Sequence, residues 1–187
     1  CSSDLRALFR ATTARQSDPA RILEEVNRLL CAEGFGSRFV TAAFLSLDAD
    51  RDALDVATAG HDPPLVWRAH AGCVESEPVP ALPLGLRPDA DYERRSIELA
   101  DGDAVVVYTD GVSEAMDADR ELFGELRLHD ALRTGAEDSA PELRDRILHA
   151  VDVHCGPTPR HDDTTMLVVR RTARDESNDS SIEREER

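Results

Sequence analysis

The stretch VVVYTDGVSEA, residues 105–115, decides the fold prediction. Three consecutive valines and a tyrosine predict a strand that is buried on both faces. The strand ends at Asp110, so it carries a carboxylate to its tip, and Gly111 follows at once. Because glycine has no side chain, another backbone segment can pass close to it. We therefore interpret the strand as a rigid support for Asp110.

Around this strand, the pattern predicts two helices, then antiparallel strands, then helices, then a last strand. Asp18 and Pro19 form a helix-start signal, since the aspartate can cap the helix and proline fits its first turn. Helical spacing covers 4–15, the segment after Pro19, 126–132 and 141–151, and extended runs cover 39–47, 54–60, 64–69, 92–99 and 164–170. This order favours an α+β fold in which helices cover hairpin-linked sheets.

The composition bounds the classes of partner. The chain has 187 residues and a net charge of −16, which disfavours nucleic acid and anionic membranes and suits a cation-binding protein. No run approaches the roughly 20 apolar residues of a membrane span. The four cysteines are widely spaced. The alternative of two disulfide bonds stays open, but the spacing favours the reduced thiols of a cytoplasmic protein. Residues 172–187 are polar and predict a disordered tail after one domain over 1–171.

A second acidic site precedes the last strand, where Asp162 and Asp163 stand side by side. If this strand and the 105–108 strand are antiparallel neighbours, the carboxylates of Asp110 and Asp162 converge at one rim of a sheet. Oxygen ligands of this kind suit Mg²⁺ or Mn²⁺. The alternative stays open that Asp-Gly is only a turn and Asp-Asp only a solvated cap. His61, in a proline-rich loop, has the same alternative of an ordinary loop histidine.

Four blocks in this chain resemble the SpoIIE-like branch of the metal-dependent (PPM, PP2C-type) Ser/Thr protein phosphatases. They are FVTAAFLSLD, ATAGHDPPLVWR, the long run from LPLG through YTDGVSEA to FGELRL, and RHDDTTMLVV. The resemblance covers about residues 1 to 171. It implies an αββα four-layer sandwich, with two antiparallel sheets face to face and helices outside.

The resemblance also implies a two-metal Mn²⁺ or Mg²⁺ centre at one end of the sandwich. By position, Asp110 with the adjoining Gly111, and Asp162, correspond to metal ligands, and the two aspartates are the implied catalytic residues. Asp163 and His61 would lie just outside the ligands. The implied chemistry is in-line hydrolysis of phosphoserine or phosphothreonine by a water activated between the cations, without a covalent enzyme intermediate.

The implied substrate is a phosphorylated protein of the anti-anti-sigma type. In such proteins a sensor domain (PAS, GAF or response-regulator) often precedes the phosphatase domain. Neither a nucleic acid nor a membrane partner is expected, and a homodimer is left open.

This chain departs from the family pattern at its N-terminal side. The family has an earlier strand that ends in an Asp, followed by a Gly-x-Gly turn, and that Asp helps to bridge both metals. We find no counterpart of that block, so we expect the domain to lack its first strands. We then expect little or no phosphatase activity from this chain alone. The alternative to an enzyme is a pseudophosphatase that binds a regulatory partner without turnover.

Overall fold

The computed structural model describes residues 2–33, 38–48, 51–76, 78, 80–158 and 162–173. The predicted tail therefore lies outside the described residues from position 174 onward. None of the helices within these ranges is both long and apolar enough to cross a membrane.

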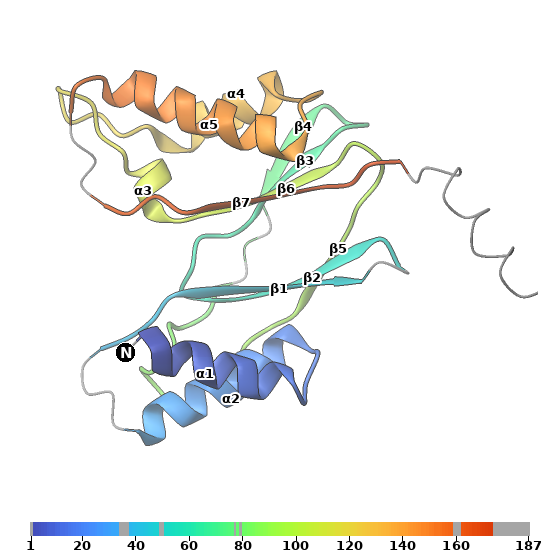
Figure 1. Ribbon diagram of the computed structural model, residues 1–187, viewed down its shortest axis with the longest axis vertical. Helices are drawn as coiled ribbons and strands as arrows, with labels where there is room; N and C mark the ends of the chain where they lie inside the picture. The colour runs from blue at the N-terminus through green and yellow to red at the C-terminus, as the bar shows by residue number, and fades with distance from the viewer. Residues whose placement is uncertain are drawn as a thin grey trace, which may run out of the picture.

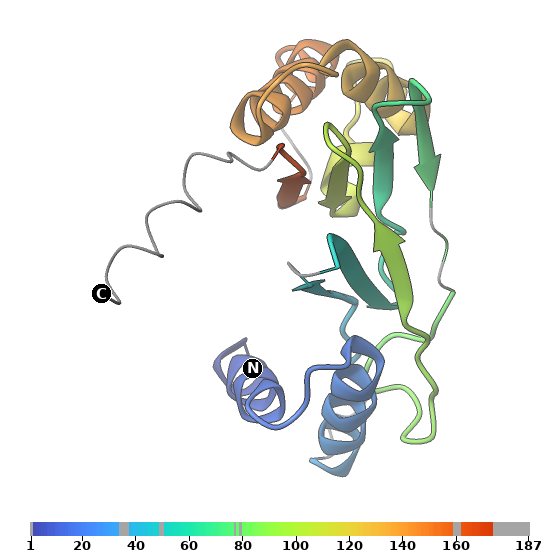
Figure 2. The same ribbon diagram turned by 90° about the vertical axis from the view of Figure 1, so that its right-hand side faces the viewer.

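Two antiparallel sheets form the middle of the molecule (Figures 1 and 2). The first has the order β1-β2-β5, with β1 Ala42–Asp48, β2 Ala53–Ala59 and β5 Arg95–Glu98. The second has the order β4-β3-β6-β7, with β4 Cys73–Ser76, β3 Leu65–Arg68, β6 Ala104–Tyr108 and β7 Met166–Arg170. Both the sheet pair and the antiparallel pairing were expected.

Helices cover the outer face of each sheet and complete four layers (Figure 1). The first sheet is covered by α1 Ser2–Thr13 and α2 Pro19–Ala32, and the second by α4 Gly124–Thr134 and α5 Ala140–Cys155. One apolar cluster fills each of the three spaces between the layers. The αββα sandwich is therefore confirmed.

Strand β6 is buried over its whole length, as its sequence predicts. Alternate residues serve different layers: Ala104, Val106 and Tyr108 pack toward α4 and α5, whereas Val105 and Val107 pack between the two sheets. The strand is thus fixed from both faces, and its end is a rigid position for the residues that follow.

Two features differ from the sequence pattern. The extended run 92–99 forms a strand only over Arg95–Glu98, because β5 pairs with β2 only between Ala53 and Val56. A short helix, α3 Asp110–Ser113, begins directly at the end of β6. Four residues are too few to produce a helical repeat of apolar residues, so periodicity does not indicate this turn.

The edge strands β1 and β7 expose apolar side chains. Within the described segments, each of these strands pairs on one side only. Leu47 of β1 is 62% exposed and Leu167 of β7 is 49% exposed. Unprotected edges of this kind are templates for strand pairing or aggregation.

The N-terminus of α2 gives a first testable prediction. The Asp18 carboxylate caps this helix by accepting from the backbone N–H of Ala20 at 2.9 Å, as the sequence indicates. We expect Asp18→Ala to lower the free energy of unfolding by about 1 kcal/mol, because the donor loses its partner. Chemical denaturation measures this change. Asp18→Asn is the matched control and should retain most of the stability; equal losses for both variants would contradict the capping role.

Candidate functional site at the end of the sandwich

The ladder between β6 and β7 brings the two acidic segments together. The strands run antiparallel, with Tyr108 opposite Met166. Beyond the ladder, the backbone N–H of Thr109 donates to the carbonyl of Thr165 at 3.0 Å. The end of β6 therefore lies beside the start of β7, as expected. Asp110 follows β6, and the Asp162-Asp163 pair precedes β7.

Two threonine hydroxyls tie these segments to each other. Oγ1 of Thr109 donates to the carbonyl of Asp163 at 3.1 Å and accepts from the backbone N–H of Thr165 at 3.0 Å. Oγ1 of Thr164 donates to the carbonyl of Gly111 at 3.3 Å. These bonds fix the distance between the backbone that carries Asp110 and the backbone that carries Asp162.

Gly111 makes the close approach sterically feasible. A Cβ atom at this position would lie 2.6 Å from the carbonyl oxygen of Asp163 and 3.5 Å from that of Asp162. Contacts below about 3 Å do not occur for real Cβ atoms, so no other residue fits without displacing the backbone opposite. The expectation that Gly111 permits a close backbone approach is confirmed.

The aspartate side chains face solvent at this end. Asp110, Asp162 and Asp163 are all exposed. One carboxylate oxygen of Asp110 accepts a hydrogen bond from the backbone N–H of Gly111 at 2.9 Å. One carboxylate oxygen of Asp162 accepts a hydrogen bond from the backbone N–H of Asp163 at 2.7 Å. These local bonds limit the rotation of both carboxylates. The site therefore presents acidic oxygens on an ordered backbone.

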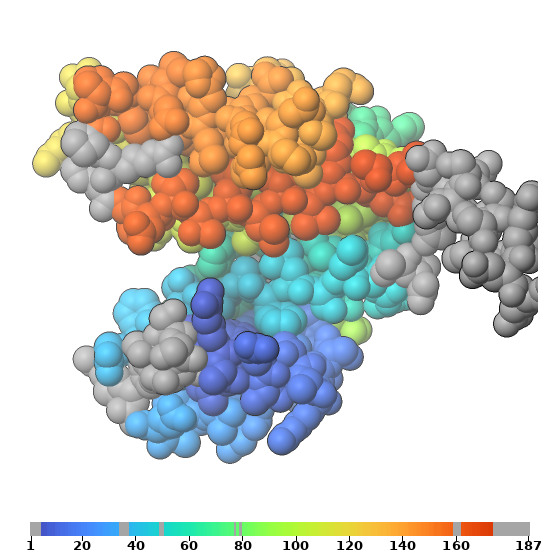
Figure 3. Space-filling model, viewed as in Figure 1, coloured from blue at the N-terminus to red at the C-terminus, as the bar shows by residue number. Residues whose placement is uncertain are grey.

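His61 and Asp110 line the same small cavity, His61 from the loop after β2 and Asp110 from the end of β6. A small cavity of about 80 Å³ is lined by Thr41, Gly60, His61, Asp62, Tyr108, Thr109 and Asp110. Nδ1 of His61 lies 3.0 Å from the carbonyl of Asp62, within hydrogen-bond distance. Figure 3 shows the surface hollowed between the orange C-terminal half and the blue N-terminal half of the molecule. His61 thus belongs to this site by position.

The loop that carries His61 is fixed by a second glycine. Gly60 adopts a φ of +65°, and a Cβ there would lie 2.4 Å from Cγ of Pro83. The LPLG block therefore packs directly against the AGH turn. Tyr108 lies beneath the same loop, where burial, with a further contribution from the Asp62 carboxylate, raises the pKa of the phenol to about 12. The phenol stays neutral at physiological pH.

The acidic residues offer the type of ligand that a divalent cation needs, but the described residues offer too few of them in one place. Carboxylate and carbonyl oxygens are the ligands that Mg²⁺ and Mn²⁺ prefer. Across the described ranges, however, no group of three or more His, Cys, Asp or Glu side chains converges as a metal site. Within the described part of the chain, Asp110 and Asp162 therefore supply only part of such a centre.

Comparison with known proteins identifies the family. The family model described as stage II sporulation protein E (SpoIIE) matches residues 1–172. The chain belongs to the SpoIIE family.

Individual relatives agree with this assignment. Phosphoserine phosphatase RsbU of Bacillus subtilis is 25% identical over 156 residues, which are 82% of this chain and 45% of RsbU. The SiaA-PP2C domain of Pseudomonas aeruginosa superposes with a TM-score of 0.76 at 26% identity, over 89% of this chain and 67% of that one. The RsbU and RsbW domains of a Mycobacterium tuberculosis protein superpose with a TM-score of 0.73 at 30% identity. The match covers 91% of this chain and 47% of that one. The chain thus spans less than half of RsbU.

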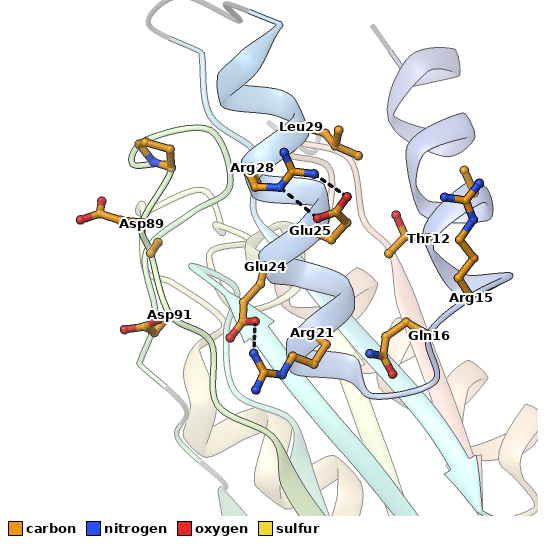
Figure 4. Close-up of a pocket in the computed structure, with 13 residues that line it drawn as sticks. Thr12, Arg15, Gln16, Arg21, Glu24, Glu25, Arg28, Leu29, Asp89 and Asp91 are labelled. Carbon is orange, nitrogen blue, oxygen red and sulfur yellow. Dashed lines mark hydrogen bonds and ion pairs between the residues drawn. The ribbon is translucent and has the colours of Figure 1, made fainter.

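A larger hollow lies elsewhere in this SpoIIE-family domain, between α1, α2 and residues 88–91 (Figure 4). Its volume is about 700 Å³. Charged side chains in its wall pair with each other: Arg21 contacts Glu24 at 3.0 Å and Arg28 contacts Glu25 at 2.7 Å. None of the predicted site residues lines it. Size alone therefore does not locate the candidate site of this SpoIIE-family domain.

Sequence reasoning missed the residues that hold the SpoIIE-family site in shape. These are Thr109 and Thr164, which tie the acidic segments together, and Thr41, Asp62 and Tyr108, which line the cavity beside Asp110. Two signals were available. Both threonines directly flank the acidic motifs, as YTDG and DDTT, and Asp62 directly follows His61. The roles of Asp110, Gly111, Asp162, Asp163 and His61 in metal binding and catalysis stay predictions.

Proposed function

We propose that this chain is the larger part of a divalent-metal-dependent phosphatase domain that hydrolyses phosphoserine or phosphothreonine on a regulatory protein. The observation that carries the proposal is the contact between Gly111 and Asp163, which brings Asp110 and Asp162 to one end of the sandwich. The membership of the SpoIIE family supports the same chemistry.

Each residue has a proposed task. Asp110, the carbonyl of Gly111 and Asp162 hold a divalent cation, Mn²⁺ or Mg²⁺, on the rim of the second sheet. Such a cation lowers the pKa of a water bound to it and neutralises phosphate oxygens. Asp163 supports the ligands, and His61 closes the site from the side of the first sheet. Without the cation, this acidic rim would repel a phosphate group.

The proposed substrate is a phosphorylated protein of the anti-anti-sigma type, under the control of a sensor domain elsewhere in the complete protein. Support comes from RsbU, whose name describes a phosphoserine phosphatase and which extends well beyond the matched part. The net charge of −16 favours a protein substrate over a nucleic acid.

A second candidate function is a pseudophosphatase that binds such a partner without turnover. The observation that favours it is the incomplete ligand set, since no third acidic side chain in the described residues joins Asp110 and Asp162. Both candidates share the fold and the site, and they differ in whether the complete protein supplies a further metal-binding Asp.

A metal titration separates the two functions. The experiment compares this chain with one extended upstream in the gene, with Mn²⁺ binding and hydrolysis of an aryl phosphate as readouts. We expect the extended protein to bind Mn²⁺ and turn over, and this chain to bind weakly with hydrolysis near background. Robust Mn²⁺-dependent hydrolysis by this chain would overturn the expectation that its metal site is incomplete. An extended protein that binds the phosphoprotein without turnover would support the pseudophosphatase.

A further inference from the structure

An exposed aromatic side chain stands on the segment that leads into β1, and Figure 1 shows the start of β1 at the same end of the sandwich as α3. Phe39 is 58% exposed, whereas Val40 beside it packs against the cluster between α2 and the first sheet. The backbone of Val40 exchanges two hydrogen bonds with that of Leu84, at 3.0 and 2.8 Å, as in an antiparallel pair. Because this segment is extended, Phe39 stands on the side opposite to Val40.

The side of the segment that carries Phe39 also borders the cavity beside Asp110. Further along, Ala43 and Leu45 belong to the same side and pack between the two sheets. Thr41 precedes them in the alternation and lines the cavity together with Asp110. Because an extended chain rises about 3.3 Å per residue, Phe39 lies one step of about 7 Å beyond Thr41. Phe39 is therefore within reach of a peptide whose phosphoserine is bound at Asp110.

Other exposed apolar side chains gather at the same place. Leu82 and Leu86 are 43% and 48% exposed, and each lies two residues from Leu84. Pro83 reaches the loop of the candidate site, since a Cβ at Gly60 would lie 2.4 Å from its ring. Single exposed apolar residues are ordinary on a protein surface, but a group of them at one place is a feature of interaction sites.

A buried amide holds this surface in shape. Asn27 of α2 is completely buried; its Nδ2 donates to the carbonyl of Arg87 at 2.7 Å, and its Oδ1 accepts from the backbone N–H of Gly85 at 2.8 Å. Gly85, with a φ of +89°, is the residue opposite Phe39 in the antiparallel pair, so no side chain from that position covers the ring. A contact surface that is already ordered loses little entropy when it binds.

We propose that Phe39, with Leu82 and Leu86 beside it, seats an apolar side chain next to the phosphoserine of the protein substrate. The inference rests on the proposed function, because the site around Asp110 is what places the substrate here. A protein that presents its phosphoserine to that site also covers the surface that borders it. The net charge of −16 gives no general attraction for a phosphorylated protein, so apolar contact is a suitable source of affinity and specificity.

Two synthetic phosphoserine peptides of equal length and charge test the inference on the upstream-extended protein. One has leucine on each side of the phosphoserine, and the other has asparagine there. We expect kcat/KM to favour the leucine peptide by at least about tenfold, mainly through KM, and Phe39→Ser to bring this preference to within about twofold of unity. Leu126→Ser, at an 86% exposed leucine of α4, is the matched control and should keep the preference.

The outcomes separate this inference from the proposed function. Hydrolysis without a preference, or a preference that survives Phe39→Ser, overturns the inference and leaves the proposed function standing. If neither peptide is hydrolysed, the proposed function fails, and fluorescence anisotropy of the labelled peptides decides the inference. The leucine peptide should then bind at least about tenfold more tightly than the asparagine peptide, and only while Phe39 is present. Equal binding overturns the inference.

Thermal unfolding tests the other possible occupant of this surface, a part of the complete protein itself. Because the Phe39 side chain is exposed, Phe39→Ser should leave the Tm of the extended protein unchanged. A Tm lowered by several degrees would mean that another segment of the complete protein covers the ring. That result would contradict a substrate contact at Phe39.

Discussion

Asp110→Asn is expected to reduce the phosphatase activity of the upstream-extended protein by more than about 100-fold, because even the loss of a group one step removed from a metal can cost that much. The amide keeps the size of the side chain and its acceptor for the N–H of Gly111, so the fold should be retained. What disappears is the negative charge that holds the cation. Initial rates and Mn²⁺ affinity, each as a function of metal concentration, measure the effect.

Two further variants give this experiment its controls. Asp162→Asn should have a comparable effect, since both carboxylates are proposed to share the cation. Asp145→Asn removes one negative charge from the exposed surface of α5, where Arg144 is its partner at 2.6 Å, and should change neither rate nor affinity. If Asp110→Asn behaved like Asp145→Asn, the assignment of the metal site would be wrong.

The central strand could be predicted because burial on both faces leaves a clear trace in sequence, whereas the four layers were expected from the resemblance to the phosphatase family. The valine run of β6 predicted a central strand, and the structure buries all five of its residues. The prediction that Asp110 and Asp162 lie at one rim of a sheet rested on one further assumption, that this strand and the last one are antiparallel neighbours. Their pairing confirms that assumption.

The shorter features were not predictable by the same means. Tyr92 fits the alternation of the run 92–99, but in the structure its ring packs into the cluster between α2 and the first sheet, outside any strand. Alternation indicates which residues share a face and does not say where pairing stops. Nor does it say which strands share a sheet: β5 precedes β6 in sequence and lies in the other sheet.

The threonine hydroxyls of the site were missed for a related reason. Thr109 and Thr164 bind backbone carbonyls across the junction of two distant segments. Such bonds follow from the register of β6 against β7, which has no periodic signal in sequence. Hydrophobic patterning therefore located the acidic groups, and the polar contacts that fix their separation became visible only in the fold.

Gly111→Ala should destabilise the chain by about 1–3 kcal/mol, the usual cost of overpacking a tight contact. The sign of the change in stability is informative, because replacing glycine by alanine within a helix normally stabilises a protein by up to about 1 kcal/mol. Here the added Cβ would lie 2.6 Å from a backbone oxygen of Asp163, which cannot rotate away as a side chain could. Urea denaturation measures the change in the free energy of unfolding.

Ser113→Ala, in the same short helix, is the control and should alter stability by no more than about 0.5 kcal/mol. A Gly111→Ala chain as stable as the parent would mean that the two acidic segments do not touch. In the extended protein, the same substitution should also lower Mn²⁺ affinity, since it moves Asp162 away from Asp110. Loss of stability with unchanged affinity would make the contact purely structural and would remove the geometric basis for a shared cation.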